Sequence, residues 1–167
     1  MATQGWEIHP PSFGIPGCSL IPEHLYREII SVIPIVCVDI VIRNEAGKVL
    51  LARRENEPLK AQWWVVGGRI QSGESARQAC IRKTFEEAGL VIDKLQFLGF
   101  YEDVFDKNSF DVSKPYHTLS LVFETSVTSK QVIHLDVQHS EWAWFDALPD
   151  RFTISSQNSL LSQMDKK

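Results

Sequence analysis

A glycine pair followed by a capped helix is the feature that most constrains the fold of this chain. The segment WWVVGGRI (63–70) is typical of a strand that ends on glycines, and a helical segment follows it. Ser75, with Gln78 three residues later, fits a capping box at the start of this helix. Gly89 fits the left-handed residue that ends it. This succession predicts a helix packed against a sheet.

The size and charge of the chain exclude several classes of protein. With 167 residues it can bury one full core, so we expect a single domain over residues 1–167. A net charge of −4 argues against nucleic acid as a partner, because nucleic-acid binders carry a basic surface. We expect no membrane partner and a cytoplasmic location, because no apolar stretch could span a bilayer and no signal peptide is recognisable. The three cysteines form no CxxC pair and fit reduced thiols.

The remaining elements follow from the spacing of apolar residues. A short helix is expected at 22–31, and the tail after Phe152 is expected to be weakly helical. Strands are predicted at 33–43, 48–54, 94–105, 116–127 and 140–150. Residues 1–20 are expected to form an N-terminal arm, 106–115 a polar loop and 153–167 a C-terminal tail. Strands on both sides of one central helix predict a mixed α/β sandwich.

The central helix carries a charged face. Residues advance by about 100° each along an α-helix, so Lys83, Glu86 and Glu87 share one face and Thr84 lies broadly opposite, where it can pack on a sheet. Ala79 is expected on the charged side, where its small side chain would leave space. Carboxylates that face a cleft favour Mg²⁺ or Mn²⁺. Taken alone, such a charged run is more often a solvated surface.

The spacing of the helix residues resembles the Nudix box of nucleoside-diphosphate-linked hydrolases. The matching positions are Gly68, Glu74, Arg82, Glu86, Glu87, Gly89 and Leu90. The resemblance implies an α/β/α sandwich with a mixed β-sheet over roughly residues 30–150, in which this helix holds a divalent metal against a diphosphate. The usual box has a glutamate directly after the arginine and then an aliphatic residue, whereas this chain has Lys83 and Thr84. One standard metal carboxylate is therefore replaced by a cation.

Other segments resemble the GDP-mannose mannosyl hydrolase branch of that family. RRENEPLKAQWWVVGGRIQ is similar to its arginine and glycine segment, and VQHSEWAWF is similar to its metal-and-base loop. In that branch, water displaces the nucleoside diphosphate from the anomeric carbon of the sugar, so a carbon–oxygen bond breaks. The resemblance implies Mg²⁺- or Mn²⁺-dependent hydrolysis of a nucleoside-diphosphate sugar, most simply GDP-mannose to GDP and free sugar, by a homodimer.

The same resemblance implies a metal site and a base. The metal ligands would be the Gly67 carbonyl oxygen, the Glu87 carboxylate and the Gln138 side-chain oxygen, and Glu86 would serve a second ion. His139 would be the general base, because an imidazole with a pKa of about 6.5 suits proton abstraction near neutral pH.

Four further residues are candidate substrate contacts. Arg54 and Arg69 would bind the diphosphate, since a planar guanidinium matches phosphate oxygens. Asp39 would hold the substrate or a charged neighbour, and His117 is a candidate sugar contact. Arg82 is instead expected to brace Glu86 or Glu74, because helix residues four apart lie side by side.

Two other functions stay open on the sequence. Glu86 would allow a second metal and with it ordinary Nudix cleavage of a P–O–P bond, releasing sugar phosphate and a nucleoside monophosphate. Lys83 is the best support for a non-catalytic module that only binds nucleotide sugars, whereas Glu87, Gln138 and His139 count against that reading.

Overall fold

A computed structural model describes residues 21–108, 110, 114–150 and 152 of the chain. The arm at 1–20 and the tail at 153–167 lie outside the described residues, as does Cys18. The elements are α1 (Glu23–Val32), β1 (Ile35–Arg43), β2 (Val49–Arg54), β3 (Trp63–Trp64), β4 (Val66–Arg69), α2 (Ala76–Ala88), β5 (Gln96–Phe105), β6 (Tyr116–Ser126) and β7 (His139–Phe145).

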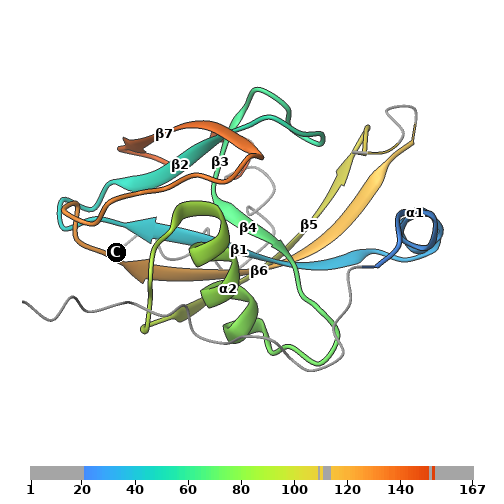
Figure 1. Cartoon of the computed structure of the whole chain (residues 1–167), viewed down its shortest axis with the longest axis horizontal. Helices are drawn as coiled ribbons and strands as arrows, with labels where there is room; N and C mark the ends of the chain where they lie inside the picture. Colours follow the sequence, from blue (N-terminus) through green and yellow to red (C-terminus); the bar gives the residue numbers. More distant parts are fainter. Residues whose placement is uncertain (1–20, 109, 111–113, 151, 153–167) are drawn as a thin grey trace, which may run out of the picture.

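The strands form one mixed sheet in the order β3-β2-β1-β6-β5, with β4 paired to β1 and β7 paired to β2 (Figure 1). β1 and β6 run parallel, with Asp39 opposite Val122, and the other pairs are antiparallel. The β-branched residues of β1 suit the pleated, buried surface of a central strand. The expected α/β fold with a mixed sheet is confirmed.

The sheet splits between β1 and β2, and this split positions the pocket described below. These two strands are in register only at Arg43 and Val49. Beyond that point β1 pairs with β4, with Asp39 opposite Gly67, while β2 pairs with β3 and β7. The single strand expected at 63–70 is therefore wrong: it breaks at Val65, because its two halves pair with strands that diverge.

Helix α2 begins and ends as its sequence predicts. The Ser75 side chain accepts a hydrogen bond from the Gln78 amide, the Gln78 side chain accepts one from the Ser75 amide, and Gly89 has φ 68°. The helix lies over β4 and β1 (Figure 1). Thr84 is buried as expected, but Ala79 is fully buried in the core and does not face a cleft. A residue without side-chain bulk is needed there because the helix packs closely on the sheet.

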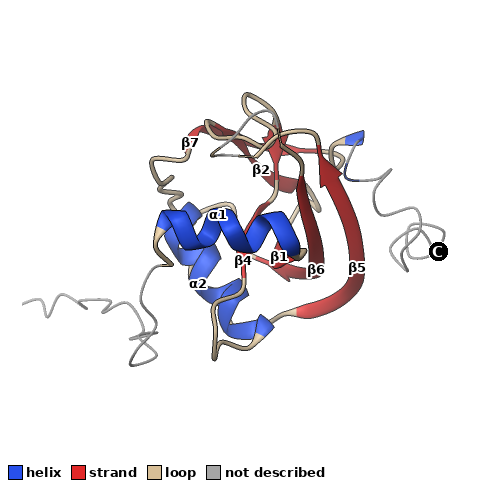
Figure 2. Ribbon diagram, turned by 90° about the vertical axis from the view of Figure 1, so that its right-hand side faces the viewer, coloured by secondary structure: helices blue, strands red, loops and turns tan. Residues whose placement is uncertain are grey.

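Helix α1 lies at the end of the β5–β6 pair, apart from α2 (Figure 1), and crosses in front of the strand ends in Figure 2. Tyr26 of α1 contacts β6 through its hydroxyl, 3.2 Å from the Tyr116 hydroxyl, and its ring meets the Phe110 ring edge-on at 5.5 Å. Cys37 and Cys80 are buried and free. Among the described residues, no helix has both the length and the apolar character needed to cross a membrane.

Candidate active site

A pocket of about 400 Å³ opens where β1 and β4 separate from β2, with α2 and α1 along its sides. That volume is suited to a small-molecule ligand. The sequence-predicted residues that line it are Asp39, Arg54, Gly67, Arg69, Glu86, Glu87 and Gln138. Long-range pairing thus gathers residues from five separate segments, which their distances along the chain could not establish.

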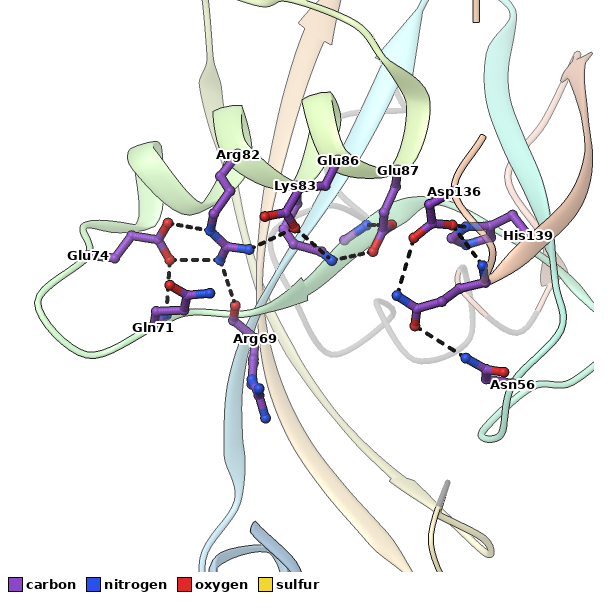
Figure 3. A network of polar contacts seen from close by, with 12 residues as sticks. Asn56, Arg69, Gln71, Glu74, Arg82, Lys83, Glu86, Glu87, Asp136 and His139 are labelled. Carbon is purple, nitrogen blue, oxygen red and sulfur yellow. Dashed lines mark hydrogen bonds and ion pairs between the residues drawn. The ribbon is translucent and has the colours of Figure 1, made fainter. Parts of the chain in front are cut away.

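Glu87 is the most enclosed of the predicted metal ligands, with its side chain 6% exposed. One carboxylate oxygen, Oε2, accepts a hydrogen bond from the Gly67 amide at 3.1 Å. The other, Oε1, lies 2.5 Å from the Lys83 ammonium (Figure 3). Glu86, one residue earlier, is 46% exposed and pairs with Arg82 at 3.1 Å. The two neighbouring carboxylates therefore have different surroundings, and only Glu87 is enclosed by the pocket.

The oxygen atoms of Gly67, Glu87 and Gln138 suit one hard divalent cation. Gly67, Glu87 and Gln138 line the same pocket and offer carbonyl, carboxylate and amide oxygens, which are ligands typical of Mg²⁺ and Mn²⁺. Among the residues that the structure describes, no three His, Cys, Asp or Glu side chains form a metal-binding group. The Gln138 amide is held by Asp136 at 3.2 Å and by Asn56 at 3.3 Å, which fixes its orientation.

His139 lies beside the pocket and not in its lining. It begins β7, pairs in register with Arg54, and is buried with 8% exposure. Its Nδ1 lies 2.8 Å from a carboxylate oxygen of Asp136, the residue that also holds Gln138 (Figure 3). This contact orients the imidazole: Nδ1 faces Asp136, so Nε2 is the ring nitrogen that faces away from it.

The candidate sugar contact His117 also lies outside the pocket lining. It sits on β6 between Tyr116 and Thr118, both of which line the pocket together with Ser120. Successive strand residues point to opposite faces, so His117 points away from the pocket. This geometry does not support the predicted contact; Thr118 and Ser120 of the same strand line the pocket instead.

Asp39 is a buried acid at the floor of the pocket. Burial raises the pKa of Asp39 to about 6, against hydrogen bonds from Tyr101 and Ser120 that lower it. The Tyr101 hydroxyl donates a short hydrogen bond to the carboxylate. A Cβ on Gly67, its partner on β4, would collide with the Asp39 side chain. Glycine is therefore required there so that the acid and the strand can approach each other.

The two predicted diphosphate ligands are held in different ways. Arg54 donates from Nε to the Pro58 carbonyl at 2.9 Å, and its charge lowers the pKa of Asp39. The Arg69 guanidinium lies 4.4 Å from the centre of the Tyr26 ring, in a cation–π contact. Figure 3 shows the Arg69 side chain extending away from Lys83 and Glu87. Both arginines line the pocket, and neither has a carboxylate partner among its described hydrogen bonds.

Arg82 forms a separate brace at the start of the helix. Its guanidinium binds both oxygens of Glu74, at 2.7 and 2.8 Å, and donates to the Arg69 carbonyl at 3.2 Å. Glu74 also accepts from the Gln71 amide at 2.9 Å. Burial acts to raise the pKa of Glu74, but the hydrogen bonds from Arg82 and Gln71 outweigh it and lower that pKa below its ordinary value. The brace predicted for Arg82 is present, and it fixes the loop between β4 and α2.

Among the pocket residues that sequence reasoning missed, three contact a predicted site residue. Tyr101 and Ser120 bind Asp39, and Tyr26 meets Arg69. The alternation of β5 and β6 could have placed Tyr101 and Ser120 on the same face, since they are directly opposite in the antiparallel register. No signal in the sequence indicates that Tyr26, on a separate helix, reaches this site.

Comparison with known proteins gives one family and several relatives. The family described as "NUDIX domain" matches residues 34–148. The low-salt glycan biosynthesis protein Agl8 of Haloferax volcanii is 34% identical over 126 residues, covering 75% of this chain and 80% of the relative. The ADP-ribose pyrophosphatase of Methanocaldococcus jannaschii is 34% identical over 90 residues, covering 54% of this chain and 49% of that protein.

Solved structures share the fold at lower sequence identity. A MutT protein from Methanosarcina mazei Go1 superposes with a TM-score of 0.62 and 24% identity, covering 80% of this chain and 97% of its own. The NUDIX domain of Shewanella oneidensis NrtR, solved with ADP ribose, gives a TM-score of 0.56 and 20% identity, covering 87% and 98%. These likenesses establish the arrangement of helices and strands.

Proposed function

The chain belongs to the NUDIX family, and we propose that it hydrolyses a nucleoside-diphosphate sugar, with GDP-mannose the first substrate to test. The observation that carries this proposal is the pairing of Lys83 with Glu87 inside the pocket. The family's usual chemistry activates water with several metals on several carboxylates, and here a cation stands where one of those carboxylates is expected. A single enclosed carboxylate supports the lesser task of neutralising a departing diphosphate.

The reaction would break the bond between the anomeric carbon and the diphosphate oxygen. Water adds to that carbon, its proton passes to His139, and the electron pair of the broken bond leaves with the nucleoside diphosphate. Asp136 holds the imidazole at 2.8 Å and stabilises its protonated form. General-base help of this kind suits attack on carbon, because water is a weak nucleophile at neutral pH.

The remaining pocket residues would bind and orient the substrate. Arg54 and Arg69 would contact the phosphates, with Arg69 leaving the Tyr26 ring to do so. Asp39 would meet sugar hydroxyls, which a carboxyl group with a pKa near 6 can bind in either protonation state. A divalent ion held by Gly67, Glu87 and Gln138 would supply charge neutralisation for the leaving diphosphate.

Relatives support the substrate class without fixing the substrate. Agl8 is named for glycan biosynthesis, a setting in which nucleotide sugars are the usual activated donors. The pyrophosphatase relative is named for ADP-ribose, itself a nucleoside diphosphate joined to a sugar.

We further propose that the chain acts as one domain and as a homodimer, for which light scattering at micromolar concentration would give twice the mass of the chain.

Hydrolysis in ¹⁸O-labelled water tests the bond. We expect the label on the released sugar, because attack is at carbon, and unlabelled GDP. A panel of GDP-, UDP- and ADP-sugars, followed by mass spectrometry of both products, would identify the base and sugar at the same time. Label in a nucleoside monophosphate or a sugar phosphate would overturn the proposal.

That second outcome corresponds to the alternative function, a diphosphatase that cleaves the P–O–P bond. Glu86 favours it, since this carboxylate faces the pocket and could serve a second ion. A third outcome, nucleotide-sugar binding without turnover at any metal concentration, would identify a binding module.

A further inference from the structure

Lys83 lies against the carboxylate that is proposed to hold a divalent cation. Its ammonium lies 2.5 Å from Glu87 Oε1 and 3.5 Å from Glu86 Oε2, and its side chain is only 13% exposed. The stem of the lysine passes beside Gly68, whose φ is 144° and where an added Cβ would lie 2.9 Å from Lys83 Cε. Gly68 of strand β4 therefore makes room for this side chain in the pocket.

The pairing leaves Glu87 no carboxylate oxygen without a donor. Oε2 accepts from the Gly67 amide and Oε1 meets the ammonium. A divalent cation at Oε1 would lie within a few ångströms of the lysine nitrogen, where two positive charges repel strongly because little water screens them. Metal and ammonium therefore exclude each other at Glu87 unless an anion joins them.

Lys83 can move in a way that its neighbour Arg82 cannot. The ammonium has a flexible stem, and its ion pairs among the described residues are with Glu87 and Glu86. Arg82 binds both oxygens of Glu74 and a backbone carbonyl as well. A compact ammonium can exchange a carboxylate for a phosphate oxygen at little geometric cost. The pocket around it is also lined by Arg54 and Arg69, the residues that would meet a diphosphate.

We propose that Lys83 is a tethered cation that competes with the divalent ion for Glu87 and is released by the diphosphate of the ligand. In the free protein, Lys83 neutralises Glu87 and keeps metal affinity low. When a diphosphate enters, Lys83 turns from Glu87 to a phosphate oxygen, and Glu87 becomes available to the metal. This inference rests on the proposed function insofar as the pocket takes a nucleoside diphosphate.

Two binding constants should then shift in opposite directions on one substitution. Lys83→Met removes the competitor, so Mn²⁺ binding to the free protein, measured by electron paramagnetic resonance, should tighten about tenfold or more, the usual size of coupling between sites. It also removes a phosphate contact, so GDP binding without metal, measured by calorimetry in EDTA, should weaken about tenfold. Measuring GDP without metal avoids chelation of Mn²⁺ by the nucleotide.

Lys48→Met is the matched control. Lys48 also pairs with a carboxylate, Asp146, at 3.0 Å, but it lies outside the pocket. Both constants should stay at their wild-type values in this variant. Lys83→Gln serves as a second variant with the same two expectations, since it keeps a polar group beside Glu87 should the methionine disturb folding.

Unchanged or weakened Mn²⁺ binding in both Lys83 variants would overturn the inference, as would metal-free GDP binding of wild-type strength. Neither measurement depends on turnover. If the ¹⁸O label enters the nucleotide while the two shifts occur, the proposed function fails and the exchange at Glu87 stands. If the label enters the sugar without the shifts, the exchange fails alone.

Discussion

Arg82 and Lys83 are adjacent on α2, both line the pocket and both are almost equally buried, with side chains 11% and 13% exposed, yet their partners lie in two different regions. Arg82 belongs to the brace, formed with Glu74 and the loop before the helix. Lys83 belongs to the pocket, where it faces Glu87 (Figure 3). Their burial is the same, so the number and geometry of their partners make the difference.

The contrast separates a cation that fixes structure from one that can exchange. A guanidinium bound to both oxygens of a carboxylate and to a backbone carbonyl has its donors committed and its plane fixed. An ammonium between two carboxylates keeps three rotatable donors and can follow a better anion. We therefore expect changes in the brace to cost stability and changes in the pocket to cost binding or catalysis.

The largest effect should come from the proposed general base, His139, which lies beside the pocket. His139→Ala should lower kcat by about 10²–10⁴, the usual contribution of a general base, with a much smaller change in KM. The thermal unfolding midpoint of His139→Ala should stay close to that of the wild type, which would show that the loss of kcat does not come from unfolding. His134→Ala, an exposed histidine of the same loop, is the control and should keep wild-type kcat. An unimpaired His139→Ala enzyme would transfer the base role to another residue, with Asp39 first.

The next effect belongs to the brace. Arg82→Met leaves Glu74 buried without its ion-pair partner, so the free energy of unfolding should fall by about 3–5 kcal/mol in urea titrations. Arg53→Met is a matched control, because Arg53 pairs with Glu141 at the same 2.7 Å but both side chains are nearly half exposed. That surface pair should contribute less than about 1 kcal/mol. If Arg82→Met and Arg53→Met lowered the free energy of unfolding equally, the buried ion pair would contribute no more to stability than the surface pair.

Glu87→Gln tests the pocket at its carboxylate. The substitution keeps an acceptor for the Gly67 amide but deletes the charge that would hold a metal, so kcat/KM should drop by about 10²–10³, equivalent to several kcal/mol of charge stabilisation. Steady-state kinetics across a Mg²⁺ series measures this. Glu141→Gln, a glutamate of the exposed surface pair, controls for loss of one negative charge. Turnover within a few-fold of wild type would show that Glu87 does not hold the metal.

The smallest effect is the acid dependence of the brace. The pKa of Glu74 is lowered in the folded protein, mainly by the hydrogen bonds from Arg82, so its contribution to stability is present above the ordinary carboxyl pKa and is lost as pH falls through the folded pKa. Unfolding free energies measured from pH 6 downward should therefore fall less steeply in Glu74→Gln than in the wild type. Glu141→Gln should keep the wild-type slope. A Glu74→Gln slope equal to that of the wild type would mean that Glu74 does not drive the acid dependence.

Elements set by local pattern were the most predictable part of the fold. Helix α2 begins after Ser75 and ends before Gly89 because side-chain caps and a left-handed glycine act within one turn. The break at Val65 was not predictable, because it depends on which distant strands β3 and β4 join. Ala79 was misassigned for a related reason: a small residue marks close approach as readily as open space.

The candidate site divides in the same way. The periodicity of the helix was enough to place Lys83, Glu86 and Glu87 on one face. It could not show that Glu87 is enclosed while Glu86 is 46% exposed, since that depends on where β4 passes the helix.

The sequence by itself determined the helix, its caps, the carboxylates that the helix carries and the lysine in place of one of them. Only the tertiary structure decided that Glu87 is enclosed by the pocket, that Tyr101 binds Asp39 across 62 residues of chain, and that Tyr26 of α1 reaches Arg69 of β4. The physical reason is range. Caps and helix faces arise from contacts within a few residues, whereas a pocket forms from strand pairings whose partners no local pattern specifies.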